Sequence, residues 1–191
     1  ATDAAGNVRT SAAVNVTVAG AQPATYSSTF RAPRCATAST SCVTGASLVN
    51  GRGTVGPETN RPNTLSASCN DGNSGTFHGS GESIDRLEVL SVSGGPIVPG
   101  ATVRVRATVW ATQSTNRVDF YSAANANSPS WTLRATATPS SLNGVTTVET
   151  TFVLPAGGTQ AVRAAMRRGG SAATCPSGNF NDRDDLVFAT N

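Results

Sequence analysis

Acidic side chains gather in two segments of the sequence, and together they could bind a metal ion. Eight of the eleven acidic residues fall in these segments, one near Cys69 and one after Cys175: Glu58, Asp71, Glu82, Asp85, Glu88, Asp182, Asp184 and Asp185. Carboxylates held close together repel one another unless something neutralises them. A hard cation such as calcium takes about six to eight oxygen ligands from carboxylates, amides and carbonyl groups. We therefore expect a structural Ca²⁺ where the two segments meet.

The stretch DGNSGTFHGSGE supplies the first set of candidate ligands. Asp71, Asn73 and Glu82 match the first, third and last positions of an EF-hand calcium loop. Gly75 and Thr76 stand where that motif requires an oxygen ligand and a glycine, so the match is partial. The flanking residues favour strands rather than helices. We infer only that this loop can wrap oxygen atoms around an ion.

Two other interpretations of the acidic residues stay open. As turn formers at the surface, they would be neutralised by Arg86 and Arg183 in ion pairs that contribute about 0 to 1 kcal/mol. As a catalytic pair, Asp71 and Asp185 could serve glycoside hydrolysis, which needs two carboxyl groups about 5 to 10 Å apart. Nothing in the sequence places a sugar substrate beside them. The types of ligand favour the cation.

Other catalytic patterns are incomplete. The segment GNSGT is similar to the nucleophile loop of trypsin-like proteases, but His78 is the sole histidine and follows Ser74 closely. A histidine in that place is a poor base for a catalytic triad. No GxSxG elbow, HExxH helix or phosphate-binding loop occurs. We expect no catalytic residue in this chain.

Four cysteines indicate disulfides and an oxidising, extracellular compartment. They allow three connectivities, and the sequence alone does not choose among them. We favour Cys35 with Cys42, which flank a short polar insert. We also favour Cys69 with Cys175, which would close a loop of about 107 residues and contribute roughly 4 to 5 kcal/mol. This second bridge would bring the two acidic segments together.

Two aromatic residues are candidates for ligand binding. Alternation along a strand puts Trp110 on the same face as Arg104 and Arg106, while Tyr121 shares a face with charged neighbours of its own strand. Aromatic rings beside charged groups can hold a sugar through stacking and hydrogen bonds. The alternative is packing against loops or a neighbouring module, because large aromatic side chains are more often buried. The candidate ligand-binding residues are therefore Trp110, Tyr121, Arg104 and Arg106.

The composition favours strands over helices. Charged residues make up only 13% of the chain, and glycine, serine and threonine, which suit helix interiors poorly, are abundant. All 14 basic residues are arginine, and the net charge of +3 is too small to argue for nucleic acid. No run of about 18 apolar residues occurs, so we expect no membrane span.

Short alternating runs between turn signals predict seven strands. The clearest covers residues 102–110, where Val103, Val105, Ala107 and Val109 share one face. The other strands are expected at residues 86–92, 117–122, 131–137, 145–154, 161–167 and 186–190. This pattern predicts an all-β fold, which we expect to be an antiparallel, jelly-roll-like β-sandwich.

The opening ATDAAGNVRTSAAVNVTV predicts a β-hairpin, and it resembles the last two strands of the Ig-like modules of secreted bacterial enzymes. The resemblance covers residues 1–20 and implies that the chain is the C-terminal part of a longer protein. We expect residues 21–34 to be a linker that docks onto a β-sandwich module at residues 35–191.

Most of the chain resembles a C-terminal module of secreted proteases and other hydrolases of myxobacteria and similar bacteria. The resemblance rests on NGRGTVGPE, PNTLSASCNDGNSGTFH, ESIDRLEV, TVWA, YSAANANSPSW, LPAGGTQAVRA and NDRDDLVFA. It implies an extracellular accessory domain without catalytic activity. The last acidic segment is also similar to the approach to the final strand in calcium-bearing jelly-roll carbohydrate-binding modules, and this similarity suggests Asp184 and Asp185 as further Ca²⁺ ligands.

The expected function is to bind polysaccharide or cell-surface glycan and to hold the parent hydrolase near its substrate. The alternative is a structural spacer or processing domain with no ligand of its own. The other expected partners are the upstream domains of the parent enzyme.

Overall fold

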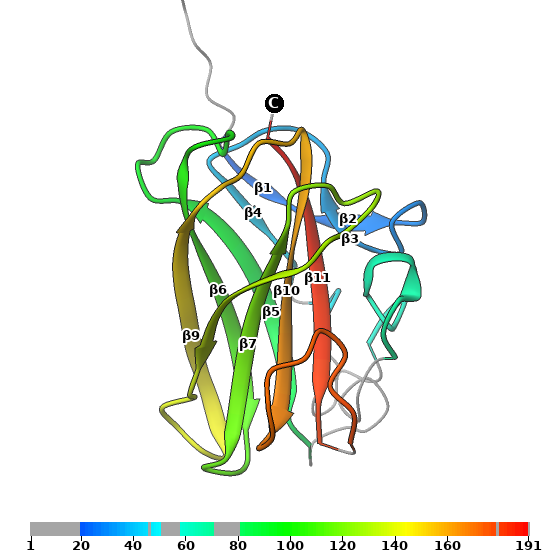
Figure 1. Cartoon of the computed structure of the whole chain (residues 1–191), viewed down its shortest axis with the longest axis vertical. Helices are drawn as coiled ribbons and strands as arrows, with labels where there is room; N and C mark the ends of the chain where they lie inside the picture. Colours follow the sequence, from blue (N-terminus) through cyan, green and yellow to red (C-terminus); the bar gives the residue numbers. More distant parts are fainter. Residues whose placement is uncertain (1–19, 46, 51–57, 71–80, 179, 191) are drawn as a thin grey trace, which may run out of the picture.

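Alternation of apolar and polar side chains produces two β-sheets that pack face to face (Figure 1). The computed structural model describes residues 20–45, 47–50, 58–70, 81–178 and 180–190. Within these ranges, every regular element is a strand except one short 3₁₀ turn, η1 (Leu65–Ala67). The expected all-β sandwich is confirmed. The predicted hairpin at residues 1–18 lies outside the described residues.

One sheet has five strands and the other has six. The five-stranded sheet contains, in spatial order, β1 (Ala21–Pro23), β4 (Ser41–Val43), β5 (Ser83–Ser91), β6 (Thr102–Ala111) and β9 (Gly144–Val153). The six-stranded sheet contains β2 (Thr25–Ser27), β3 (Ala32–Cys35), β11 (Asp182–Ala189), β10 (Thr159–Arg168), β7 (Asn116–Ala123) and β8 (Thr132–Ala137). Each of the seven strands expected from the sequence overlaps one of these.

The sheets are mixed rather than purely antiparallel. Strand β1 runs parallel to β4, and β3 runs parallel to β11, whereas the other paired neighbours are antiparallel. Both parallel pairs involve strands at the start of the described chain. Residues 21–34, expected to be a linker, contribute β1 and β2 and most of β3. The jelly-roll connectivity stays a prediction.

The inner faces of the two sheets form the main hydrophobic core. The predicted inward residues of β6, from Val103 to Val109, are completely buried. They face Val118 and Phe120 of β7, together with residues of β10 and β11. Two disulfides, Cys35 with Cys42 and Cys69 with Cys175, join the expected partners, with Cα atoms 5.8 and 5.5 Å apart.

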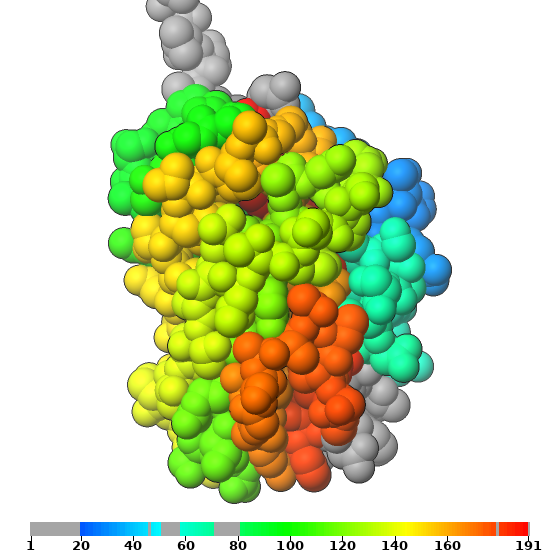
Figure 2. All heavy atoms as spheres, in the orientation of Figure 1, coloured from blue at the N-terminus to red at the C-terminus, as the bar shows by residue number. Residues whose placement is uncertain are grey.

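The outer face of the six-stranded sheet is covered by long connections. Figure 2 shows the connection after β7 and the connection after β10 lying over this face. A second apolar cluster fills the space beneath them: Phe30, Ala32, Leu65, Ala126, Ala161 and Val187, with Trp131 packed against it. Outward side chains of β10 and β11 are therefore buried, and their charges need partners inside the protein.

Two arginines of β10 meet that requirement with bidentate ion pairs. Arg163 donates to both carboxylate oxygens of Asp185 at 2.7 and 2.8 Å. Arg167 donates to both oxygens of Asp119 at 2.6 and 3.1 Å. All four residues are buried, so each charge depends on its partner.

We predict that Asp119→Ala destabilises the fold by about 3 to 5 kcal/mol, because it leaves the buried Arg167 guanidinium without its carboxylate. Urea unfolding followed by circular dichroism measures the change. The control is Glu149→Ala, which removes an exposed carboxylate paired with Arg104 and Arg106 and should cost about 0 to 1 kcal/mol. Equal losses in the two variants would contradict the prediction.

Candidate functional site

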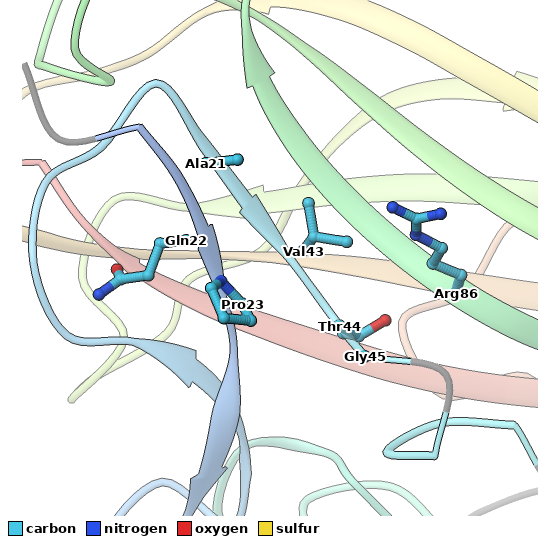
Figure 3. A pocket seen from close by; sticks show the side chains of 7 residues that line it. All are labelled: Ala21, Gln22, Pro23, Val43, Thr44, Gly45 and Arg86. Atoms are coloured by element: carbon cyan, nitrogen blue, oxygen red, sulfur yellow. The ribbon is translucent and has the colours of Figure 1, made fainter.

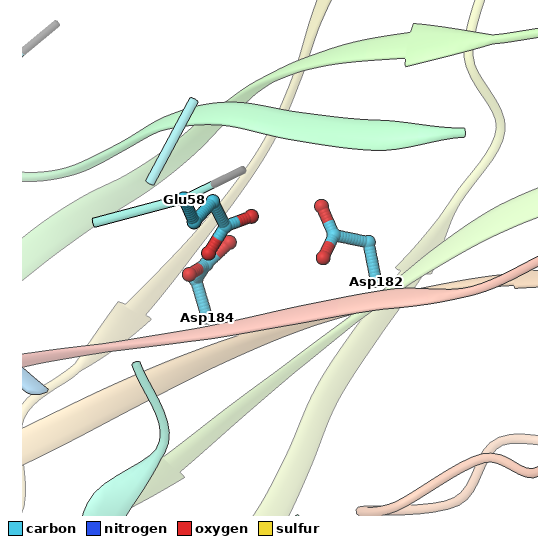
Figure 4. A group of neighbouring side chains, drawn as sticks. All are labelled: Glu58, Asp182 and Asp184. Atoms are coloured by element: carbon cyan, nitrogen blue, oxygen red, sulfur yellow. The ribbon is translucent and has the colours of Figure 1, made fainter. Parts of the chain in front are cut away.

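Three buried carboxylates come together on the inner side of the sandwich. Asp182 and Asp184 lie on β11, two residues apart, so both face the five-stranded sheet. Glu58 approaches from the connection between β4 and β5 (Figure 4). One ligand oxygen from each residue lies within 4.8 Å of the others, which makes this group a candidate cation site.

Hydrogen bonds to this carboxylate cluster favour its ionised form. The backbone N–H groups of Ile84 and Arg183 donate to the two oxygens of Asp182 at 2.5 and 3.0 Å. The Asn63 side-chain amide donates to Glu58 at 3.0 Å. Donors stabilise a carboxylate, whereas burial and the neighbouring acids oppose its charge.

The sequence-predicted calcium ligands do not form one group in the described structure. Asp184 belongs to the carboxylate cluster, but Asp185 points to the opposite face of β11 and pairs with Arg163. Glu82 pairs with Arg168 at 2.5 Å. Asp71 and Asn73 lie outside the described residues, as do Ser74 and His78.

Glu58 and Asp182 are among the clustered acids of the sequence, but neither was predicted as a ligand, for different reasons. The position of Asp182 could have been predicted from the sequence. The last strand begins at that residue, and alternation then places Asp182 and Asp184 on the same face. The prediction started this strand at Leu186 and therefore treated the acids as a preceding loop. No sequence signal separates Glu58 from the other acids, since a connection brings it to the cluster.

Glu82 is a buried acid with a separate set of partners. Burial raises its pKa, yet the pKa lies below the ordinary value of 4.5 because hydrogen bonds outweigh burial. The donors are the Thr112 hydroxyl, the Arg168 guanidinium, the Glu82 backbone amide and the Asn116 side chain. Glu82 thus joins the start of β5 to the ends of β6 and β10 as a structural anion.

Three of the four candidate ligand-binding residues share the outer face of the five-stranded sheet. Arg104, Arg106 and Trp110 alternate along β6 and are partly exposed. Ion pairs cross the neighbouring strands on this face. Arg106 lies between Glu88 of β5, at 4.0 Å, and Glu149 of β9, at 3.2 Å. These residues define an exposed sheet face with charged and apolar groups side by side.

Tyr121, the fourth candidate, lies on the outer face of the other sheet and is only 4% exposed. Burial and the adjacent Asp119 carboxylate raise its pKa, although two nearby arginines act in the opposite direction. Alternation correctly placed Tyr121 beside charged residues but gave no information on the loops that cover that face. The ring packs inside the protein and offers no open stacking surface.

A pocket of about 430 Å³ lies beside β1 and β4, at one edge of the five-stranded sheet (Figure 3). Its walls come from β1 and β4, including Pro23 and Val43, and Arg86 of β5 reaches toward it. Arg86 pairs across the strands with Thr108 of β6, two residues before Trp110. The pocket and Trp110 are therefore neighbouring parts of one surface.

No protein-family model matches the chain, and comparison with curated proteins gives no match either. Among the described residues, no helix has the length and apolar character needed to cross a membrane. The candidate sites are therefore supported by their geometry alone.

We predict that Glu82→Gln weakens the dependence of stability on pH. Because the folded-state pKa of Glu82 is lowered, its ionisation stabilises the fold above the ordinary value of 4.5, and this contribution is lost as the pH falls through the folded-state pKa. Urea unfolding between about pH 7 and about pH 3 should show a smaller loss of stability in the variant than in the wild type. Identical pH profiles would contradict this role of Glu82.

Proposed function

We propose that this protein is a non-catalytic, extracellular accessory module of a secreted hydrolase, and that it binds carbohydrate or cell-surface material through its exposed sheet face. Two disulfides and a sequence without lysine fit an extracellular domain. The resemblance to C-terminal modules of secreted hydrolases supports the connection to an enzyme.

The observation that carries this proposal is the shared position of Trp110, Arg104 and Arg106 on one partly exposed face. An indole ring offers an apolar surface on which a sugar ring can stack, and the guanidinium groups offer donors to hydroxyl and carboxylate oxygens. The ion pairs with Glu88 and Glu149 hold Arg106 in place before a ligand arrives. Such preorganisation lowers the entropic cost of binding.

The adjacent pocket extends this surface. Pro23 and Val43 give it apolar walls, and the Arg86 side chain, 49% exposed, supplies donors at its edge. A chain of sugar units could therefore contact Trp110 with one ring and the pocket with another. Tyr121 takes no part in this proposal.

We also propose a structural Ca²⁺ at the carboxylate cluster of Glu58, Asp182 and Asp184. Carboxylate oxygens are the ligands that calcium prefers. Glu58 and Asp184 come from segments far apart in the sequence, so an ion between them would fasten the connection before β5 to the last strand. The ion would stabilise the fold and would have no part in binding glycan.

We predict that Trp110→Ala lowers retention on insoluble polysaccharides and glycan arrays at least tenfold, because stacking on the indole ring is lost. The matched control is Leu133→Ala, which removes an exposed apolar side chain from the edge of the other sheet and should leave binding unchanged. If wild-type protein binds no glycan at all, the spacer function replaces the binding function.

We predict that EDTA lowers the melting temperature and that Ca²⁺ restores it. Saturation at about 100 times Kd corresponds to about 2.7 kcal/mol. Asp184→Asn should abolish this response, because it removes one of the three carboxylates that would bind the ion. Glu149→Gln, at an exposed carboxylate, should keep the response. An unchanged wild-type melting curve would remove the Ca²⁺ from the proposal.

A further inference from the structure

The disulfide between Cys69 and Cys175 lies directly against the guanidinium group of Arg163. The Arg163 side chain is 1% exposed, and one of its terminal nitrogens, Nη1, lies 2.9 Å from the sulfur of Cys69. The same nitrogen lies 3.8 Å from the sulfur of Cys175. A permanent positive charge is therefore buried beside one sulfur of the bridge.

The five N–H donors of Arg163 can be counted against their acceptors. Two bind the carboxylate of Asp185, one binds the Thr174 carbonyl oxygen at 2.9 Å, and one binds the Ser68 hydroxyl at 3.1 Å. The remaining N–H points to the sulfur of Cys69. The sulfur of a disulfide is a weak acceptor, whereas a thiolate is a charged and strong one. This donor is thus better matched to Cys69 as a thiolate than to Cys69 in the disulfide.

The two cysteines of this bridge also differ in access to solvent. Cys69 is 3% exposed, whereas Cys175 is an exposed residue in the connection between β10 and β11. In thiol–disulfide exchange, the incoming thiolate attacks one sulfur and the other sulfur leaves as a thiolate. Access favours attack on Cys175, and the Arg163 donor favours departure of Cys69.

From this geometry we propose that the Cys69–Cys175 disulfide is a directed site of thiol–disulfide exchange with small thiols. A thiolate attacks the sulfur of Cys175 and forms a mixed disulfide as the bond to Cys69 breaks. The electron pair of that bond stays on Cys69, whose thiolate accepts the Arg163 hydrogen bond. A second thiol then attacks the mixed disulfide, so that two thiols become one small-molecule disulfide and the protein gains two reduced cysteines.

The other disulfide provides an internal comparison. Cys35 and Cys42 are 1% and 0% exposed. Their sulfurs lie near backbone carbonyl oxygens, at 3.4 Å from Gln22 and 3.8 Å from Val187. Carbonyl oxygens lie just as near the sulfurs of the other bridge, at 3.3 Å from Thr174 to Cys69 and 3.6 Å from Ser68 to Cys175, so they do not distinguish the two bridges. The difference is burial, which blocks the attacking thiol at Cys35–Cys42. This bridge should resist exchange under conditions in which Cys69–Cys175 opens.

The first test uses wild-type protein and reduced glutathione, with acid quenching and peptide mapping by mass spectrometry. We expect Cys69–Cys175 to open at least tenfold faster than Cys35–Cys42, and we expect glutathione on Cys175. Equal rates for the two bridges would mean that exchange follows general unfolding and would overturn the proposal. Glutathione found mainly on Cys69 would also overturn it.

The second test compares Arg163→Lys with Arg167→Lys. Both variants keep a positive charge in a buried ion pair of β10, but only Arg163 contacts the bridge. The opening rate of Cys69–Cys175, divided by that of Cys35–Cys42 in the same molecules, should fall about tenfold in Arg163→Lys and stay unchanged in Arg167→Lys. An unchanged ratio in Arg163→Lys would exclude the proposed role of the arginine. If Arg163→Lys fails to fold, the wild-type experiment decides alone.

Discussion

The buried ion pair between Arg163 and Asp185 is the contact on which the covered side of this sandwich depends. Asp185 also accepts the backbone N–H of Leu65 at 2.6 Å, and its own N–H donates to the Asn63 carbonyl oxygen. Arg163 reaches Ser68 on one connection and Thr174 on another, and its guanidinium stacks on the Trp131 ring. One charge pair on adjacent strands thus fixes three connections over the six-stranded sheet. Without either partner, a buried charge would remain and these connections would lose their common anchor.

The same strand shows how alternation divides charges of one sign between two environments. Asp182 and Asp184 face the interior between the sheets, whereas Asp185 faces the covered outer surface. Arginine neutralises the outward acid. The inward acids meet Glu58 and receive hydrogen bonds from backbone and amide N–H groups, which is the environment of a ligand set for a hard cation. A run of acids that looks uniform in the sequence therefore lies in two different environments.

The alternation of apolar and polar residues predicted the strands and the side chains that face the core. The inward residues of β6 followed directly from alternation, and the polar insert between Cys35 and Cys42 indicated their bridge. Three features depended on distant contacts and were not predictable in this way. Glu58 reaches the acidic cluster through a connection, Tyr121 is covered by loops, and the segment expected to be a linker completes the edges of both sheets. Alternation assigns side chains to faces, but it does not say which face is covered.

The two outer faces consequently have different physical roles. On the six-stranded sheet, the outward charges of β10 and β11 must be satisfied inside the protein, and the Cys69–Cys175 bridge restrains the covering loops by closing a long stretch of chain. On the five-stranded sheet, Arg104 and Glu149 are 43% and 44% exposed, and their ion pair is worth little to stability. Substitutions there are tolerated by the fold, so that face can change its side chains to suit a ligand. A stable covered face and an adaptable exposed face fit the accessory binding module that we propose, and strand alternation lets one short chain supply both.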